Sequence, residues 1–444
     1  MIQPFRPPSS VFELKSTSKP VRRALLVGVC WNHESAEEAA SLLDELNALV
    51  DTMGMTVLER ILIKSVQPHA RFLLGSGKAA EVIALARARK AEIIVFDHPI
   101  SPSQQRNWET LSQLAVIDRE EVILEIFARR ARSREARLQV ALARTEYSLP
   151  RLQRAWEHLS RQGGTGFGAM GAGETQLETD RRLVRRRISN LKGELAEVHS
   201  QRATRRKQRL RRPTAHAAIV GYTNAGKSSL FQCLTETRVL VEDKLFATLD
   251  TTTRKIELPD GQSLLLTDTV GFIRKLPHKL IESFKATLEE SVLADFLIHV
   301  LDVSNPAVIQ FHRTTMDVME ELGADITRTI TVFNKVDLQS DQVRISSLQR
   351  QFPDALFISA HTGQGLPELR NRMVDMLSDW VTCGDYLLPQ SRYDLVSSLH
   401  RYGRIWAQAY EGDCIRLTAS LPPKWTSLFA QYRVNGANSN LLSS

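Results

Sequence analysis

Apolar runs of strand length recur along the first part of the chain, at Ala24–Val29, Val57–Ile63, Ile93–Asp97 and Ala115–Asp118. Between them, Ser35–Met53 and Lys78–Lys90 place apolar residues at helical spacing. An apolar face with a period of 3.6 residues predicts a helix, and a short continuous apolar run predicts a buried strand. Strands separated by helices predict a parallel sheet, and hence an N-terminal α/β domain.

A different pattern begins near Arg119. Residues 119–160 are rich in arginine and helical in pattern, with an interruption expected at Pro150, and a glycine-rich stretch follows at Gly163–Gly173. From Glu174 onwards apolar residues form a narrow stripe, at Leu177, Val184, Ile188, Leu191, Leu195 and Val198. Such a stripe is typical of helices that pack along their length. We therefore expect two long antiparallel helices with a glycine loop at their tip.

Residues 214–380 return to alternating strands and helices. After Trp380 we expect a helix at Leu395–Ala409 and a strand at Cys414–Ala419, which together are enough for a small C-terminal α+β domain.

Composition excludes several classes of protein. The chain has 444 residues, 43% of them hydrophobic, and four cysteines that show no CxxC spacing, which argues against a disulfide framework or a zinc site. Its N-terminus lacks the apolar segment of a secretory signal, and its apolar runs are far shorter than a membrane span. We therefore expect a cytoplasmic protein with no stable membrane insertion; peripheral contact with a membrane stays open.

Positive charge is concentrated in one segment. Between Arg181 and Arg212 there are thirteen lysines and arginines and two glutamates, a net charge of +11 in a chain whose formal net charge is +8. The run Arg205–Arg212 contains no acidic residue. Blocks of like charge repel one another and often bind nucleic acid, so we expect this segment to contact RNA. The alternative is a solvated helix face.

The most specific chemical motif is the octapeptide Gly221, Tyr222, Thr223, Asn224, Ala225, Gly226, Lys227 and Ser228. It follows the apolar run Ala217–Val220 and precedes a helical stretch, which is the strand–loop–helix context of a phosphate-binding loop (P-loop). The glycines let backbone N–H groups curve around a phosphate, Lys227 reaches the β- and γ-phosphates, and the Ser228 hydroxyl binds Mg²⁺. The motif predicts a nucleoside triphosphate site.

A second motif follows about forty residues later, where an apolar strand ends in Asp268, Thr269, Val270 and Gly271. Asp268 can hold the hydration shell of Mg²⁺, and Gly271 lets a backbone N–H approach the γ-phosphate. Between the two motifs, the stretch Lys244–Arg254 contains four threonines, Thr248, Thr251, Thr252 and Thr253. One of them is expected to bind the metal and sense the γ-phosphate, but their spacing does not choose among them.

A third motif, Asn334, Lys335, Val336 and Asp337, predicts which base is bound. The Asp337 carboxylate can accept from both N–H groups on the edge of guanine, whereas adenine would leave it unpaired. The stem of Lys335 can cover the base. After the next strand come Ser359, Ala360 and His361, where a backbone N–H can meet the guanine carbonyl. In this order the motifs predict a site for GTP and GDP.

The residue after Gly271 is Phe272, where many GTPases carry a glutamine that orients the attacking water. A phenyl ring cannot hydrogen-bond water, so we expect slow intrinsic hydrolysis that a partner stimulates. Arg274 is an alternative source of the missing group.

Two other glycine-rich segments resemble nucleotide sites less well. Gly75 to Lys78 (GSGK) opens a predicted helix but lacks the full spacing, so we prefer a helix-start turn to a second site with ATPase activity. Gly163–Gly173 follows a helix rather than a strand, which disfavours dinucleotide binding.

Beyond these motifs, the chain resembles the HflX family of ribosome-associated GTPases, in the Obg-like superfamily, from about Ala24 to about Val434. The resemblance rests on five segments, Leu73–Glu81, Val116–Leu152, Gly173–Arg182, Asp243–Asp250 and Asp268–Ile273. Two departures are a longer glycine stretch, with Phe167 and Met170 in it, and Thr251 where the family typically has proline.

The resemblance implies a switch threonine at Thr248, within the segment Phe246, Ala247, Thr248, Leu249 and Asp250. It also implies a hydrophobic residue at position 272. By similarity, the partner is the large ribosomal subunit, with the helical hairpin reaching the peptidyl-transferase region of ribosomal RNA. The implied activity is the splitting or rescue of stalled ribosomes under stress.

Together, the patterns and the resemblance predict a multidomain α/β protein. We expect an N-terminal parallel α/β domain at 1–118, a helical hairpin at 119–212, a P-loop GTPase (G) domain at 213–380 and a C-terminal domain at 381–444. In this GTPase, Lys227, Thr248 and Gly271 act in catalysis, and Ser228 and Thr248 bind Mg²⁺. We expect a monomer that binds ribosomal RNA and not DNA, or alternatively an RNA-binding scaffold whose hydrolysis is incidental.

Overall fold

The computed structural model describes residues 23–152, 170–210, 214–236, 245–246, 248–275, 290–339, 341–378, 382–402, 404–421 and 428–434. Most of the expected glycine tip, the end of the basic run and Ala247 lie outside these residues. The contacts between residues group the chain into two compact units. The first unit comprises residues 1–201, 241–250 and 270–288, and the second comprises residues 202–240, 251–269 and 289–444. None of the helices that the structure describes is long and apolar enough to span a membrane.

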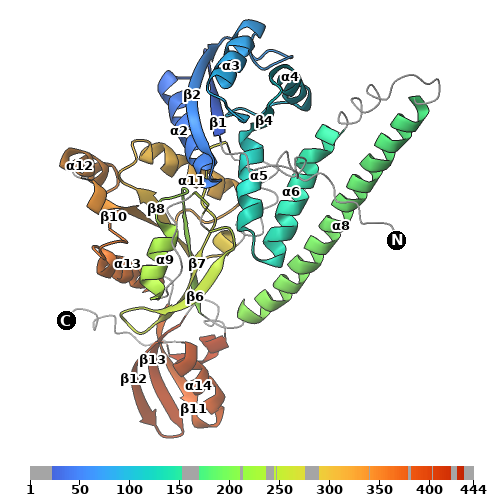
Figure 1. The fold of residues 1–444 in the computed structure, drawn as a ribbon. Coiled ribbons are helices and arrows are strands. Elements are labelled where there is room, and N and C mark those ends of the chain that lie inside the picture. The colour runs from blue at the N-terminus through green and yellow to red at the C-terminus, as the bar shows by residue number, and fades with distance from the viewer. Residues whose placement is uncertain are drawn as a thin grey trace. The chain divides into compact units, whose positions relative to one another are not determined.

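The first unit contains a four-stranded, all-parallel sheet in the order β2-β1-β3-β4, which confirms the predicted α/β domain (Figure 1). Its strands are β1 (Arg23–Trp31), β2 (Thr56–Ser65), β3 (Ile93–Phe96) and β4 (Ala115–Asp118). The connecting helices are α2 (Ala36–Thr52), α3 (Ser76–Ala88) and α4 (Pro102–Ser112). Ser35 caps α2 by accepting from the Glu38 N–H, and Trp108 of α4 packs on Phe96 in the core.

Three helices follow in the same unit, α5 (Arg119–Arg130), α6 (Arg134–Leu152) and α8 (Met170–Leu210). Two side-chain pairs, Glu135 with His199 and Glu146 with Lys192, show that α6 and α8 run antiparallel, because the later residue on α6 meets the earlier residue on α8. Two members of the predicted apolar stripe of α8, Val184 and Leu191, are buried. The sequence-predicted hairpin is therefore formed by α6 and α8, with α5 packed beside α6 (Figure 1).

The prediction that Pro150 interrupts the helix is wrong. The helical stretch after Arg119 breaks at residues 131–133 instead, and α6 continues through Pro150 to Leu152. Ser133 begins α6 because its hydroxyl accepts a hydrogen bond from the Ala136 N–H at 3.1 Å. Pro150 lies within the last described turn of α6, where a missing N–H and a local distortion affect little of the helix.

The second unit contains a six-stranded sheet in the order β10-β9-β8-β5-β7-β6, parallel except for the pairing of β6 with β7. Its strands are β5 (Ala215–Gly221), β6 (Thr252–Glu257), β7 (Ser263–Asp268), β8 (Phe296–Asp302), β9 (Thr329–Asn334) and β10 (Leu356–Phe357). Its helices are α9 (Lys227–Thr235), α11 (Val308–Glu321), η1 (Val336–Leu338), α12 (Gln342–Gln351) and α13 (Leu366–Ser378). Because the carboxyl ends of parallel strands share one edge, the loops after β5 and β9 and the end of β7 lie together there.

A four-stranded antiparallel sheet, in the order β12-β13-β11-β14, follows in the same unit. Its elements are β11 (Thr382–Pro389), η2 (Gln390–Arg392), α14 (Tyr393–Tyr402), β12 (Arg404–Glu411), β13 (Cys414–Leu421), η3 (Ala430–Tyr432) and β14 (Arg433–Val434). The helix expected at Leu395–Ala409 therefore ends at Tyr402, and its second half is wrong. Residues 404–411 are instead an edge strand paired with β13, where the aromatic side chains of Trp406 and Tyr410 suit a strand.

Candidate nucleotide-binding site

The P-loop joins the end of β5 to the start of α9. Gly221 has a φ of +146° and Gly226 a φ of +91°. A Cβ at Gly221 would lie 2.2 Å from the backbone oxygen of Val300, and a Cβ at Gly226 would lie 2.2 Å from the side-chain nitrogen of Asn334. Both positions therefore need glycine, because the backbone is left-handed or nearly so and its neighbours are close.

Lys227 is the first residue of α9 and is buried. Its Nζ donates to the backbone oxygen of Tyr222 at 2.7 Å. Burial lowers the pKa of Lys227 to about 8, and the Asp268 carboxylate offsets part of this effect. A buried ammonium is stabilised by an anionic neighbour, and the N-terminus of α9 adds N–H groups with the same preference. This end of the loop is therefore suited to phosphate.

Ser228 and Asp268 lie side by side next to the lysine. The Ser228 hydroxyl donates to Oδ2 of Asp268, the last residue of β7, at 2.8 Å. A hydroxyl and a carboxylate are hard oxygen ligands of the kind that Mg²⁺ prefers. No three His, Cys, Asp or Glu side chains form a metal cluster among the described residues, so an ion here would complete its shell with water and phosphate oxygens. The residues present fit Mg²⁺.

Two threonines near the loop differ in what their hydroxyls do. Thr269 is wholly buried and donates to the backbone oxygen of Ile219 at 2.6 Å, so it ties the end of β7 to β5. The buried hydroxyl of Thr223 has no hydrogen-bond partner in the part of the chain that the structure describes. Leaving a buried hydroxyl unpaired costs stability, so Thr223 marks the loop interior as a place for a polar ligand.

Asn334 connects three segments that are far apart in the sequence. Its Nδ2 donates to the backbone oxygen of Ala225 in the P-loop at 2.9 Å, and its Oδ1 accepts from the N–H of Ala360 at 2.9 Å. The side chain is buried at the end of β9. Asn334 therefore links the phosphate side of the site to the two segments expected to bind guanine.

The remaining predicted guanine residues lie around Asn334. Lys335 has a φ of +67°, and its ammonium pairs with Asp302 at 2.8 Å. Asp337 is exposed within η1, so its carboxylate is accessible to a base. Val336 donates through its N–H to the backbone oxygen of Ile358 at 3.2 Å, which holds the two loops together.

One residue at this site was missed by the sequence analysis. The thiol of Cys233, on α9, donates to the backbone oxygen of Ala360 at 2.9 Å. Ser359 is wholly buried and accepts the Thr362 N–H through its hydroxyl, whereas His361 is exposed. No spacing rule identifies Cys233, because the contact joins residues that are 127 positions apart.

Comparisons with known proteins agree with this geometry. Three family models match consecutive parts of the chain: "GTP-binding GTPase N-terminal" at residues 40–128, "GTP-binding GTPase Middle Region" at 130–209 and "50S ribosome-binding GTPase" at 216–335. The GTPase HflX of Akkermansia muciniphila is 51% identical over 423 residues, which are 93% of this chain and 97% of that protein. The chain belongs to the HflX family of GTPases.

A second member of the family matches over a similar extent. The GTPase HflX of Escherichia coli K12 is 41% identical over 392 residues, covering 88% of this chain and 91% of that protein. A GTP-binding protein from Sulfolobus solfataricus, solved in complex with GDP, aligns over 81% of this chain and 99% of that chain at 22% identity and a TM-score of 0.43. As an HflX-family GTPase, this chain binds guanine nucleotide.

The predicted site residues divide between the two units. The P-loop, Asp268, Thr269, Asn334–Asp337 and Ser359–His361 belong to the second unit, where the contacts above bring most of them together. Phe246, Thr248, Leu249, Asp250, Val270 and Gly271 belong to the first unit. The sequence predicts Thr248 and Gly271 at the nucleotide, and this placement stays a prediction.

Phe272 and Arg274, which follow Gly271, are buried in the first unit. The Arg274 guanidinium pairs with Glu45 at 3.2 Å and donates to the Ser41 hydroxyl at 2.9 Å, both on α2. These contacts favour an anchoring role for Arg274 over the alternative that it replaces the missing glutamine.

Arg119 completes this buried ion network. Its guanidinium pairs with Glu45 at 2.8 Å and with Asp97 at 2.7 Å, and it donates to the backbone oxygen of Arg274 at 3.2 Å. Burial opposes the charge of Arg119, but Glu45 and Asp97 outweigh it and raise its pKa. Two buried guanidiniums and two carboxylates therefore fix the segment after Gly271 against α2 and the end of β3.

The GSGK segment of the N-terminal domain forms the start of α3, with Gly75 as its N-cap. Lys78 is exposed and pairs with Glu81 one turn later, at 2.7 Å. Neither glycine of this segment has a positive φ. These features favour a helix-start turn over a second phosphate site.

Proposed function

We propose that this HflX-family GTPase is a nucleotide-controlled factor that binds the large ribosomal subunit and splits or rescues ribosomes under stress. The G-domain segment at 216–335 matches a family described as 50S ribosome-binding. The observation that carries the proposal is the basic surface of α8, on a chain that also holds a guanine-nucleotide site.

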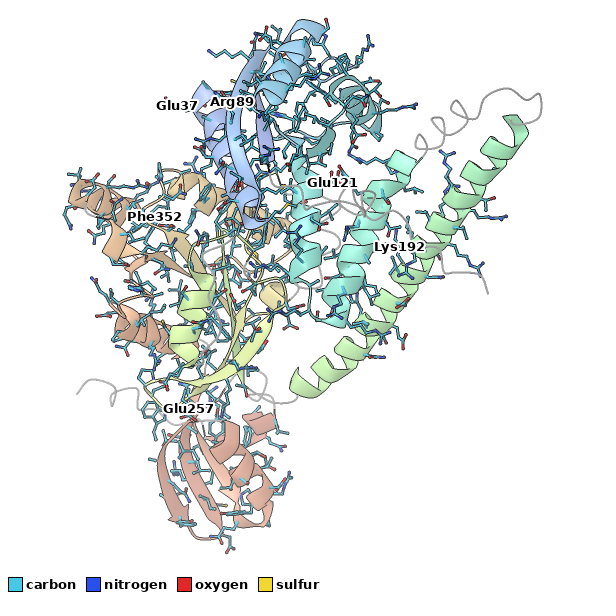
Figure 2. All side chains as sticks on the ribbon, in the orientation of Figure 1. Glu37, Arg89, Glu121, Lys192, Glu257 and Phe352 are labelled. Carbon is cyan, nitrogen blue, oxygen red and sulfur yellow. The ribbon has the colours of Figure 1, made fainter. Side chains whose placement is uncertain are left out.

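The basic surface is formed by exposed arginines on successive turns of α8, Arg182, Arg185, Arg186 and Arg187. Figure 2 shows Lys192, which is also exposed, further along the same helix. Closely spaced cations release counterions from phosphates when they bind nucleic acid, which favours ribosomal RNA as the partner. The run Arg205–Arg212 continues this charge along the sequence, and the glycine tip at the other end of α8 would approach the peptidyl-transferase region.

The nucleotide chemistry is assigned to residues of the P-loop, the switch segment and the second and third motifs. Lys227, Thr248 and Gly271 contact the β- and γ-phosphates, and Ser228 and Thr248 hold Mg²⁺. The ion, when bound, neutralises charge that develops on the phosphates. Asn334, Lys335 and Asp337 select guanine, with the backbone of Ser359–His361 on the base carbonyl.

Hydrolysis is expected to be slow in the free protein. Phe272 is buried and apolar at the position where a water-orienting group is needed. The ribosome would supply or position that group, so that hydrolysis follows binding and releases the factor. In this scheme the division 1–118, 119–212, 213–380 and 381–444 separates sheet, hairpin, G domain and C-terminal domain of a monomer.

The test is GTP turnover by the purified chain with and without large ribosomal subunits. We expect stimulation by the subunits in the wild type. Lys227→Ala should lose tight GTP binding in calorimetry, while Lys78→Ala, the matched change at the GSGK segment, should bind and hydrolyse GTP normally. Absence of stimulation would reject the partner, and unchanged affinity in Lys227→Ala would reject the phosphate site.

A second candidate function is an RNA-binding scaffold, favoured by the fact that the exposed arginines of α8 belong to a helix and not to the nucleotide loops. The scaffold would bind subunits equally well without nucleotide and with a GTP analogue that resists hydrolysis. The switch requires tighter binding with the analogue. The same subunit-binding assay therefore decides between them.

A further inference from the structure

The switch segment that contains Thr248 is attached to the start of helix α6. Oδ2 of Asp250 accepts hydrogen bonds from the backbone N–H groups of Arg132 and Ser133, at 2.9 and 3.0 Å. Its Oδ1 accepts from the Ser133 hydroxyl. Hydrogen bonds to a carboxylate are among the stronger ones in proteins, and three of them converge on this side chain.

Ser133 links Asp250 to the helix itself. Its hydroxyl donates to Asp250 and accepts from the N–H of Ala136, in the first turn of α6. A carboxylate at this position also interacts favourably with the positive end of the helix dipole. Any displacement of Asp250 therefore acts on the N-terminus of α6.

A second contact holds the other end of the same segment. The ring of Phe246 lies edge-on against Phe127 of α5, with ring centroids 4.6 Å apart, and both rings are buried. Phe246 has a φ of +55°, an uncommon conformation for a bulky residue, which its packing must stabilise. Thr248 thus lies between two anchors, one on α5 and one on α6.

Helix α6 is also fixed at its far end. The guanidinium of Arg151 stacks over the Tyr147 ring at 3.5 Å from its centroid, and it pairs with the buried Asp118 carboxylate at 3.4 Å. With Glu146 paired to Lys192, α6 is joined both to the N-terminal sheet and to α8. A helix of 19 residues spans about 28 Å, so α6 is a stiff connection between Asp250 and the contacts at its own far end.

We propose that Asp250 is a positioning residue that couples Thr248 to the helical hairpin through the N-terminus of α6. The inference rests on the proposed function, because it gives a route between the RNA-binding hairpin and the nucleotide switch. GTP, by ordering Thr248, fixes α6 in the orientation that binds the subunit. By thermodynamic linkage, subunit binding to the hairpin favours the ordered position of Thr248.

The first experiment measures the affinity of the full chain for large ribosomal subunits with a non-hydrolysable GTP analogue and with GDP. The ratio of the two affinities measures the coupling. Ser133→Ala and Asp250→Ala should each lower this ratio about fivefold or more, the lower end of ordinary allosteric coupling. Ser148→Ala is the matched control on the same helix, because its hydroxyl donates to the Thr145 backbone oxygen within the helix, and should leave the ratio unchanged.

Two comparisons separate coupling from loss of helix stability. Asp250→Ala keeps the Ser133 cap on α6, and Ser133→Thr restores a hydroxyl and a cap. The double variant Ser133→Ala with Asp250→Ala should show no further loss beyond Asp250→Ala alone, because the Asp250 side chain accepts all three hydrogen bonds of this link. A wild-type ratio in Asp250→Ala, or fully additive losses, would overturn the proposal.

The second experiment does not need the ribosome. Hydrogen exchange of a peptide spanning residues 134–141 should be slower with the GTP analogue than with GDP in the wild type, and equal in Asp250→Ala. If wild-type protein fails to bind subunits but shows this nucleotide dependence, the proposed function fails and the coupling stands. If exchange in the wild type is the same with both nucleotides, the coupling fails whatever the subunits do.

Discussion

At the scale of single residues, the guanine loop depends on a side chain outside every motif. The carbonyl of Ala360 accepts from Cys233 and its N–H donates to Asn334, so the peptide groups on both sides of Ala360 are held. In the proposed function, the orientation of Ala360 sets the direction of the neighbouring backbone N–H groups that would face the base carbonyl. We therefore propose Cys233 as a positioning residue for guanine rather than a ligand.

Replacing Cys233→Ala should weaken GDP binding about two- to tenfold, the usual effect of one hydrogen bond. Binding of the diphosphate of 2-aminopurine riboside, which lacks the base carbonyl, should be unaffected in calorimetry. Cys233→Ser keeps a donor and should retain most of the GDP affinity. Equal losses for the two nucleotides would show a general effect on α9 instead.

His299 gives a prediction on pH. It is wholly buried in β8, and neither ring nitrogen has a hydrogen-bond partner among the described residues. Burial lowers its pKa far below the usual value, and the nearby His312 and Lys227 lower it further. Below pH about 6.5, His299 therefore binds a proton in the unfolded chain but not in the folded chain. The free energy of unfolding consequently falls as the pH decreases.

His299→Phe removes this proton uptake. Between pH 6.5 and 5 its free energy of unfolding should fall less steeply than that of the wild type, by up to about 1.4 kcal/mol per pH unit. The measurement is urea-dependent hydrogen exchange of a β8 peptide, because a chain of several domains need not unfold in one step. The exposed His33→Phe should keep the wild-type slope.

At the scale of elements, the segment after Gly271 is held on α2 by charges. Glu45 faces two buried guanidiniums, those of Arg119 and Arg274, while Asp97 completes the network. A buried charge that loses its partner is costly, whereas an exposed pair contributes little. This network therefore contributes to the stability of the N-terminal sheet and also holds the segment after Gly271 in position.

Glu45→Gln should lower the free energy of unfolding of the first unit by about 3–5 kcal/mol, because it leaves two cations facing one carboxylate. Urea unfolding followed by tryptophan fluorescence measures the change, since Trp31 and Trp108 lie in this core. Glu59→Gln, which breaks the exposed pair with Arg89, should cost no more than about 1 kcal/mol. Similar losses in both variants would contradict the importance of burial.

At the scale of the whole molecule, the exposed basic residues and the predicted nucleotide residues belong to different elements. The basic residues lie on α8, and the nucleotide residues lie on loops of the six-stranded sheet. The proposed RNA contact can therefore be altered without changing a residue of the nucleotide site.

Replacing Arg182, Arg185, Arg186 and Arg187 by glutamine should weaken subunit binding and flatten its dependence on salt. Each lost phosphate contact reduces the slope of log K against log salt by about 0.7–0.9. Intrinsic GTP affinity should not change. Glutamine at four exposed cations elsewhere, Lys64, Lys90, Arg350 and Arg372, makes the same change in net charge and should leave the slope intact.

Much of this molecule follows from local sequence. Strand runs and helix spacing predicted the parallel N-terminal sheet and the alternating strands and helices of residues 214–380, because burial of an apolar face is recorded within a few neighbouring residues. The P-loop could equally be predicted from the sequence, since the positive φ at Gly226 and the lysine beside it belong to one octapeptide. The local sequence did not predict the helix break at 131–133 or the strand at 404–411. There the local preferences are nearly equal, and the Ser133 cap and the pairing with β13 decide between them.

The sequence by itself determined the family, the nucleotide motifs and the order of the domains, all of which depend on residues close together in the chain. The tertiary structure alone decided which distant residues support them. Asp250 meets Ser133 across 117 positions, Cys233 meets Ala360 across 127, and Arg274 meets Glu45 across 229. Such contacts leave no periodicity or spacing in the sequence, because only the folded backbone brings their partners within hydrogen-bond distance.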